Sequence, residues 1–489
     1  MILFFSKKKG DVVTTFYRIV KVTDCDATSL YNLVCSTLQE DELRVEMLVG
    51  IGLDGTNVMI GRNHSLAALL KQKIPDLIVI KCSSHSLHLC AEKAAESLPR
   101  QLEFLLRETH NWFSYSAKRL DAYRDLFEVM NNSRNPKKIA GFCGTRWLAR
   151  YNAITTILDQ WEELQLLFLL SKREDRCYMA EKLHDIMKCP VFKGYLMFLK
   201  ERLNMLFQSE NVESVKLLED VYLLLRGLLQ KLVVPAQLEK LSDKDLITFD
   251  FKQYMMHTSA INLGHDTEVL LREVNQNEAC ELRDRCRNFM VTLCSEVQSR
   301  TPEHIHILKS VSLLTPQIAT SQVKPDLTNF LQMFERFMAV RPKPNLNGTI
   351  KTNLHHKEWR NTSSSVSFWA EVNTDLDAGG IKRFAAISKF ALAVLSMPLS
   401  NATVERAFSI YSIIKNKLRN RLSVEMLQHL MMVRYSLKRN YTSCVTFKPT
   451  DAMLKKFSNE MYDFKKKMTA DDIEVQTMDT FQECLEMLD

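Results

Sequence analysis

The feature that most constrains the fold is a long stretch, from Tyr151 to Phe330, in which apolar residues recur at helical spacing. Leu, Phe and Met return every three or four positions, for example over Trp161 to Leu170 and over Leu217 to Leu232. That period places apolar side chains on one face of a helix. The stretch has no strand-like alternation and no fixed repeat length, which argues against a solenoid. We therefore predict an all-helical domain here.

The N-terminal part has a different pattern. Residues 2–5 form a short apolar run, residues 7–11 read Lys-Lys-Lys-Gly-Asp, and residues 12–22 are rich in Val, Thr, Tyr, Phe and Ile. Gly10 can take the positive φ of a tight turn, and the flanking residue types fit a pleated surface. We therefore predict a β-hairpin over the first 22 residues.

Strands and helices then alternate. The apolar spacing predicts a helix over 27–40 and a second helix over 63–73. Short apolar runs at 48–53 and 76–82 predict two buried strands. Strands that alternate with helices indicate an α/β core.

Length and composition limit the number of domains and the class of protein. The 489 residues suffice for two or three domains, and the apolar content of 46% is that of a globular chain. No apolar window is long enough for a membrane span, and the N-terminus does not resemble a signal peptide. The 12 cysteines form no CxxC pair, so we expect reduced thiols and an intracellular protein. As partners we expect neither a membrane nor a small-molecule substrate.

Two carboxylates stand at the edges of predicted elements. Asp54 follows the 48–53 strand and precedes Gly55, and Glu405 falls in the first turn of a predicted helix. Carboxylates are the ligands that Mg²⁺ prefers. The alternatives are a turn-forming Asp before Gly and a Glu that complements the helix dipole. Spacing alone favours these structural alternatives.

Four motifs, taken together, resemble the hAT superfamily of DNA transposases. They are Gly52-x-Asp54-Gly55-x-Asn57-x-Met59, Cys82-x-x-His85, Arg146-Trp147, and the run from Met397 through Glu405 to Ser409. The resemblance covers most of the chain and implies an RNase H-like core interrupted by a large all-helical insertion. It places the first part of the core at 1–150, the insertion at 151–372, the last part of the core with the dimerisation region at 373–440, and a tail at 441–489.

The resemblance also assigns roles. Asp54 and Glu405 match the second catalytic Asp and the catalytic Glu, His85 lies near the active site or DNA, and Arg146-Trp147 opens the insertion, with the Trp linked to stacking on flipped DNA. The alternatives are a capping His85 beside a buried Cys82, and a core Trp beside an exposed Arg. A zinc site is not expected, because two ligands are not four.

The segment 406–440 is basic. It holds eight Lys/Arg and one Glu, a net +7, whereas residues 441–489 hold six Lys and ten Asp/Glu, a net −4. Such a segment suits a polyanion, although a solvated helix face has the same composition. The resemblance extends through this segment, and the candidate DNA-contacting residues in it are Lys415, Lys417, Arg419 and Arg421.

An apolar helical stripe follows. Val424, Leu427 and Met431 share one helix face, with Leu430 beside them. An ordinary core helix explains the stripe. The resemblance implies the hAT C-terminal dimerisation region, in which helices from two chains pack together, and hence a homodimer.

The first catalytic Asp of the family precedes a hairpin like that of residues 2–22. The Asp residues before Asp54 lack its context: Asp11, Asp24, Asp26 and Asp41. We therefore expect a core without its first strand and a metal site that lacks one of its three carboxylates. Mg²⁺ would be bound only if activity remains. The resulting hypothesis is a domesticated, catalytically inactive, nuclear hAT-like dimer that binds DNA weakly. The alternatives are a residual Mg²⁺-dependent transposase or nuclease, and a protein-interaction module without a DNA role.

Overall fold

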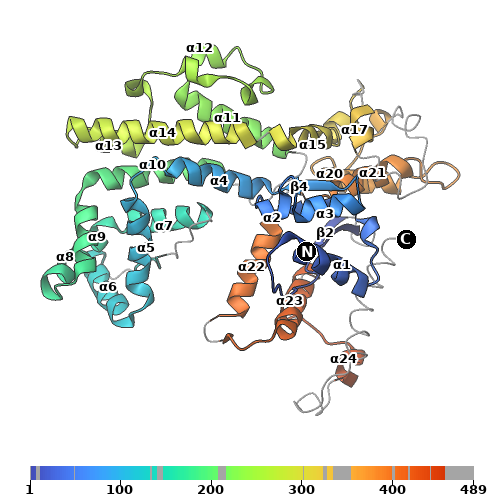
Figure 1. Ribbon diagram of the computed structural model, residues 1–489, viewed down its shortest axis with the longest axis horizontal. Coiled ribbons are helices and arrows are strands. Elements are labelled where there is room, and N and C mark those ends of the chain that lie inside the picture. Colours follow the sequence, from blue (N-terminus) through green and yellow to red (C-terminus); the bar gives the residue numbers. More distant parts are fainter. Residues whose placement is uncertain are drawn as a thin grey trace. The chain divides into compact units, whose positions relative to one another are not determined.

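The computed structural model describes the chain in segments, which are residues 2–6, 11–48, 50–132, 135–139, 147–207, 216–300, 302–322, 328–333, 354–398, 402–416, 419–440 and 442–456. The described residues are mostly helical (Figure 1). They fall into two compact units. One, the discontinuous unit, comprises Met1–Ser83 and Lys309–Asp489, and the other, the helical unit, comprises Ser84–Leu308.

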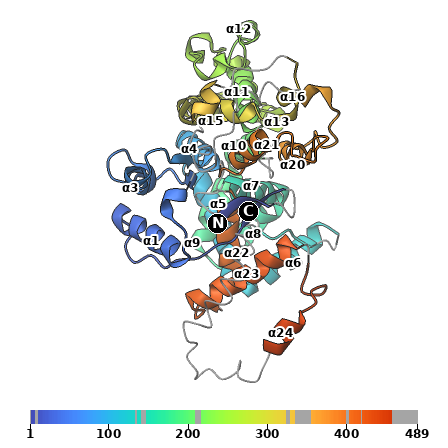
Figure 2. The same cartoon turned by 90° about the vertical axis from the view of Figure 1, so that its right-hand side faces the viewer.

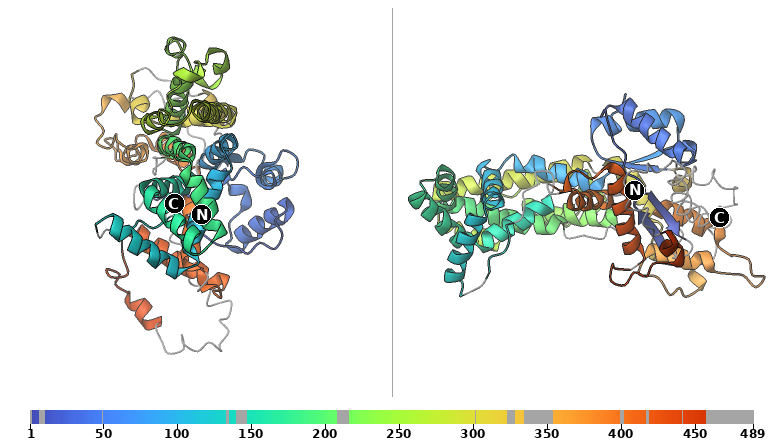
Figure 3. Two further views of the ribbon diagram at one scale, coloured as in Figure 1. Left: turned by 90° about the vertical axis from the view of Figure 1, so that its left-hand side faces the viewer. Right: turned by 90° about the horizontal axis from the view of Figure 1, so that it is seen from below.

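The named elements described between residues 151 and 330 are helices, as predicted, and most of them belong to the helical unit. Its longest described helix, α14 (Gln276–Arg300), packs against α11 (Leu217–Leu232) and α10 (Pro190–Phe207). The helices of this unit run from light blue to yellow in Figure 3. Phe198 of α10 and Phe289 of α14 meet edge to face, with ring centroids 5.5 Å apart. The other helices of this unit are α4 (Ser83–Ala95), α5 (Gln101–Ser114), α6 (Ala117–Met130), α7 (Trp147–Asp159), α8 (Trp161–Glu174), α9 (Tyr178–Lys188), α12 (Pro235–Leu238), η2 (Asp245–Ile247), η3 (Phe251–Tyr254), η4 (Thr258–Ala260), α13 (His265–Leu270) and α15 (Pro302–Ser312). Helix α4 starts at the first boundary of the unit, and α15 crosses the second.

The discontinuous unit contains all the described strands. β1 (Ile2–Ser6) pairs antiparallel with β2 (Asp11–Thr15), and β3 (Gly50–Leu53) pairs parallel with β4 (Ile78–Lys81). Among the described residues these pairs stay two separate two-stranded sheets. The expected α/β pattern is therefore present, but a single mixed sheet of the RNase H kind is not formed by the residues described.

The parallel pair is covered by helices close in sequence. Helix α1 (Ala27–Glu40) has the predicted bounds, because Asp26 accepts hydrogen bonds from the backbone N–H groups of Thr28 and Ser29 at its start. Helix α3 (Leu66–Lys73) starts at its cap, Ser65. Together with η1 (Val45–Met47) and α2 (Asn57–Ile60), these elements enclose the buried side chains of Val45, Leu53, Leu66, Ala67, Leu70, Ile74 and Leu77.

The antiparallel pair is covered by helices from the other end of the chain. Helix α20 (Ser365–Thr374) contacts β2, and α21 (Ala385–Leu395) contacts β1 and α20. Figure 3 shows the hairpin in dark blue. The buried Trp369 fixes this layer by donating its indole N–H to the Leu314 carbonyl at 2.8 Å. The smaller elements here are α16 (Pro316–Ala319), α17 (Thr328–Met333), η5 (Leu354–His356) and α24 (Asp451–Lys456).

The predicted strand over 12–22 is too long. β2 ends at Thr15, and the next residues leave the sheet. Phe16 is buried against α22 (Ala402–Ile414) and α23 (Val424–Arg439), and the Tyr17 hydroxyl donates to Asp41 at the end of α1. The strand-like composition of this segment therefore serves packing between helices, not a sheet.

Candidate functional site

The Asp54 carboxylate closes a local turn. Asp54 directly follows β3, and the next turn begins helix α2. Its Oδ1 accepts one hydrogen bond from the Thr56 backbone N–H at 3.1 Å and another from the Thr56 hydroxyl at 2.7 Å. This geometry is that of a turn-forming Asp, the structural alternative that the Asp-Gly spacing favoured. The strand before Asp54 ends at the predicted residue.

Glu405 lies in the first turn of α22, as predicted. The helix begins at Ala402, so Thr403 is inside it and cannot be its N-cap. The backbone position suits a carboxylate that complements the helix dipole. The Glu405 side chain lies outside the described part of the structure, so its role as a metal ligand with Asp54 stays a prediction. Among the side chains that are described, no three His, Cys, Asp or Glu residues lie together as a metal site.

The Cys-x-x-His motif follows β4. Cys82 is buried, and its backbone N–H donates to the Leu53 carbonyl at 2.9 Å, which continues the parallel pairing by one residue. His85 is partly buried in the first turn of α4. Burial explains the cysteine without a metal, and the nucleic-acid role of His85 stays a prediction.

The Arg-Trp motif starts a helix. Trp147 is the first residue of α7, which agrees with its predicted place at the opening of the helical region. Arg146 and the Trp147 side chain lie outside the described residues. Their contact with DNA stays a prediction.

The four candidate basic residues between α22 and α23 divide into two kinds. The Lys415 ammonium donates to the Leu422 carbonyl at 3.2 Å and so holds the loop closed. Arg419 and Arg421 are exposed, and the described part of the chain offers neither guanidinium an ion-pair partner. Lys417 lies outside that part. Among the members of this set that the structure describes, the two arginines are therefore the ones whose charge is open to solvent.

Helix α23 buries one stripe within its own chain. Leu427 and Met431, two of the predicted dimerisation residues, are each only 1% exposed and pack with Phe16, Ala407 and Ile414. Figure 2 shows α22 and α23 in orange-red, and the two helices are in contact.

The N-terminal segment completes this cover. The Phe16 and Tyr435 rings stack with centroids 5.8 Å apart, and the Ile19 N–H donates to the Gln428 side chain at 3.4 Å. The other two predicted dimerisation residues, Val424 and Leu430, are partly buried.

The same region has exposed apolar side chains that the sequence did not single out. Met426 and Val433 of α23 are 49% and 58% exposed, and Phe408 and Ile413 of α22 are 59% and 61% exposed. The signal that could have found the first two is their spacing of seven residues, which returns to the same helix face after two turns.

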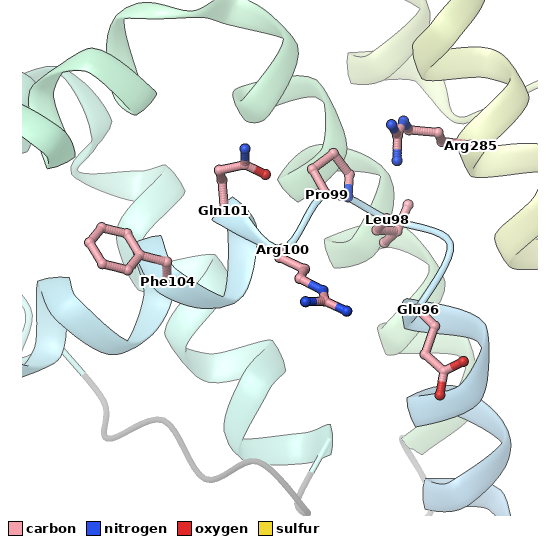
Figure 4. A pocket seen from close by; sticks show the side chains of 7 residues that line it. All are labelled: Glu96, Leu98, Pro99, Arg100, Gln101, Phe104 and Arg285. Carbon is pink, nitrogen blue, oxygen red and sulfur yellow. The ribbon is translucent and has the colours of Figure 1, made fainter.

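The helical unit has an open depression of about 540 Å³ at the start of α5 (Figure 4). Arg100 and Arg285 line it together with Glu96. The Arg285 Nε donates to Glu281 at 2.9 Å, and Glu96 pairs with Lys93 at 2.6 Å. Because Arg285 and Glu96 already have partners in the chain, the depression itself does not identify a ligand.

Comparison with known families concerns the C-terminal part. Residues 353–437, which span α20 to α22 and most of α23, match the model of the hAT family C-terminal dimerisation region. Comparison with curated proteins found no match. No helix in the described residues has the length and apolar character to cross a membrane. The chain therefore contains a hAT family C-terminal dimerisation region at residues 353–437.

Proposed function

We propose that the chain is a hAT transposase-derived protein that works as a homodimer and no longer catalyses DNA strand transfer. The observation that carries the proposal is the match of residues 353–437 to a dimerisation region. The matched helices are ordered parts of the fold, since α20 and α21 cover the N-terminal hairpin and α23 holds Phe16. A region that is integrated in this way can present its outer surface to a second copy.

The proposed architecture is an RNase H-like core split by a helical insertion. It is supported by the return of the chain after residue 308 to the unit that holds all described strands. It is also supported by Asp54 at the carboxyl end of a parallel strand, the edge at which such folds carry ligands. The family-based boundaries at 150, 372 and 440 belong to this proposal.

Loss of catalysis is proposed from the local chemistry of Asp54. Its Oδ1 accepts two hydrogen bonds from Thr56, the pattern of an Asp that shapes its own turn. The enzymatic alternative, in which Asp54 and Glu405 still hold Mg²⁺, would use the second carboxylate oxygen of Asp54 and would need a third acidic ligand. We therefore assign no cofactor to the protein.

DNA contact is proposed through the exposed guanidinium groups of Arg419 and Arg421. Guanidinium groups bind phosphate oxygens, and such contacts are largely independent of sequence. A nuclear site of action would follow from this contact and from the family relation.

The test of dimerisation is light scattering on the purified full chain over a range of concentrations. The proposal predicts a species of twice the 56.7 kDa chain mass at micromolar concentration. A wild-type monomer up to tens of micromolar would contradict it and favour the protein-interaction module.

The DNA contact is tested separately with the R419A/R421A variant. Each lost phosphate contact lowers the slope of log K against log salt by about 0.9, so the variant should lose roughly 2 from the slope of the wild type. A wild-type affinity that hardly changes between low and physiological salt would remove DNA from the proposed function.

A further inference from the structure

Helix α23 has two apolar stripes, not one. At 100° per residue, Leu427 and Met431 lie about 40° apart on one face. Met426, Leu430, Val433 and Leu437 lie within about 60° of one another on a neighbouring face, centred about 110° away from the first. The first set is the inner stripe, and the second set is the outer stripe.

The inner stripe is fully occupied within the chain. Its two side chains are 1% exposed, under Phe16 and the buried residues of α22. No surface of these side chains remains for another molecule. A partner that binds α23 without unfolding the discontinuous unit must therefore use a different face.

The outer stripe has the spacing of a coiled-coil seam. Its members follow one another at intervals of four, three and four residues, the d-a-d-a order of a heptad. Met426 and Val433 are 49% and 58% exposed, whereas Leu430 and Leu437 are partly buried. The stripe runs along about 16 Å of the helix, which covers most of its length.

Helices α20 and α21 of the matched region bury their large apolar side chains. In α20 and α21 the large apolar side chains of Phe368, Trp369, Val372, Phe390 and Leu392 are at most 6% exposed. Large apolar side chains that are exposed and lie on described helices of the region belong to α22 and α23. Since the matched family region is a dimerisation region, we expect its exposed apolar side chains to face a second copy of the chain.

We infer that the outer stripe of α23 packs against a second copy of this chain, with Met426 and Val433 as the central contacts. This inference rests on the proposed homodimer and assigns its contact face. A two-fold arrangement brings the same stripe from both copies together, so every residue is used twice. Glu425, His429, Arg434 and Lys438 are exposed on the same helix and would supply the polar rim that such interfaces have.

The test is light scattering of the full chain with M426D/V433D beside wild type. V129D/L223D is the matched control, because Val129 and Leu223 are 83% and 62% exposed and lie on helices outside the matched region. Four buried carboxylates per dimer should raise the dimer dissociation constant by at least roughly 100-fold, while the control stays at the wild-type value. Circular dichroism checks that both variants are folded, and M426S/V433S serves if the Asp variant is not.

The outcomes separate the two levels of the proposal. A folded monomer from M426D/V433D, with dimeric wild type and control, supports the assigned face. A dimer that persists in M426D/V433D overturns the assigned face and leaves the homodimer standing. A monomeric wild type overturns the homodimer itself and, with it, the assignment of the outer stripe as its contact face.

Discussion

The Asp54 loop and helix α23 were both singled out by sequence motifs, yet they relate differently to the rest of the chain. In the loop, the carboxylate finds its hydrogen-bond donors two residues away, at Thr56. In α23, the inner stripe is covered by the chain's own N-terminal segment, whereas the outer stripe keeps exposed apolar side chains. A carboxylate whose hydrogen bonds are made within its own turn does not require a binding partner. Exposed apolar side chains on a dimerisation region do require one.

The largest loss of stability is expected from L427D/M431D, which tests whether the inner stripe is part of the core. Both side chains are 1% exposed, and replacing two buried apolar groups by carboxylates should cost at least about 4 kcal/mol of unfolding free energy. Urea unfolding followed by circular dichroism measures the loss. M426D/V433D is the control and should change the stability of the monomer by no more than about 1 kcal/mol. If L427D/M431D were as stable as wild type, the inner stripe would not be a core.

A smaller effect is expected at Asp54. D54A removes the acceptor for two hydrogen bonds from Thr56 and should destabilise the chain by about 1 kcal/mol, whereas D54N keeps an acceptor oxygen and should cost less than about 0.5 kcal/mol. Thermal unfolding of both variants measures the difference. Added Mg²⁺ should leave the Tm of wild type unchanged. A Tm that rises with Mg²⁺ in wild type but not in D54N would show that Asp54 is a metal ligand after all.

The smallest effect concerns Glu425, at the start of α23. Hydrogen bonds from its own backbone N–H and from the Ser423 hydroxyl lower the pKa of this carboxyl below its ordinary value of 4.5. The charged form therefore favours the folded state above pH 4.5, and this contribution is lost as pH falls through the lowered pKa of the folded chain. E425Q should have a slightly lower Tm than wild type at pH 7, and the difference should vanish in acid. An equal difference at both pH values would exclude the carboxylate charge as its cause.

Local pattern predicted much of the fold. Helix α1 has the predicted bounds because its signal, an Asp cap followed by helically spaced apolar residues, lies within the helix itself. The end of β3 at Leu53 was likewise predictable from neighbouring residues, and the start of α7 at Trp147 agrees with what the family resemblance implied. The Thr56 partner of Asp54 was also within reach, since Asp followed two residues later by Thr is a turn signal.

The assignment of the two α23 stripes could not come from local pattern. The contact between Ile19 and Gln428 joins residues 409 positions apart, and Phe16 was predicted to lie in a strand. Helical spacing shows that a face is apolar, but it does not show which distant segment covers it. The family resemblance placed Leu427 and Met431 at a dimer surface, whereas their burial agrees with the alternative of an ordinary core helix.

The measurement that tests the central claim most directly is peptide-resolved alkylation of two single-cysteine replacements, V433C and M431C, at rising protein concentration. Mass spectrometry separates the introduced thiols from the native ones. We predict that V433C reacts fast in dilute solution and becomes protected as dimers form, while M431C is protected at every concentration. If V433C kept its fast rate at concentrations where light scattering shows dimers, the outer stripe would not be the contact between copies.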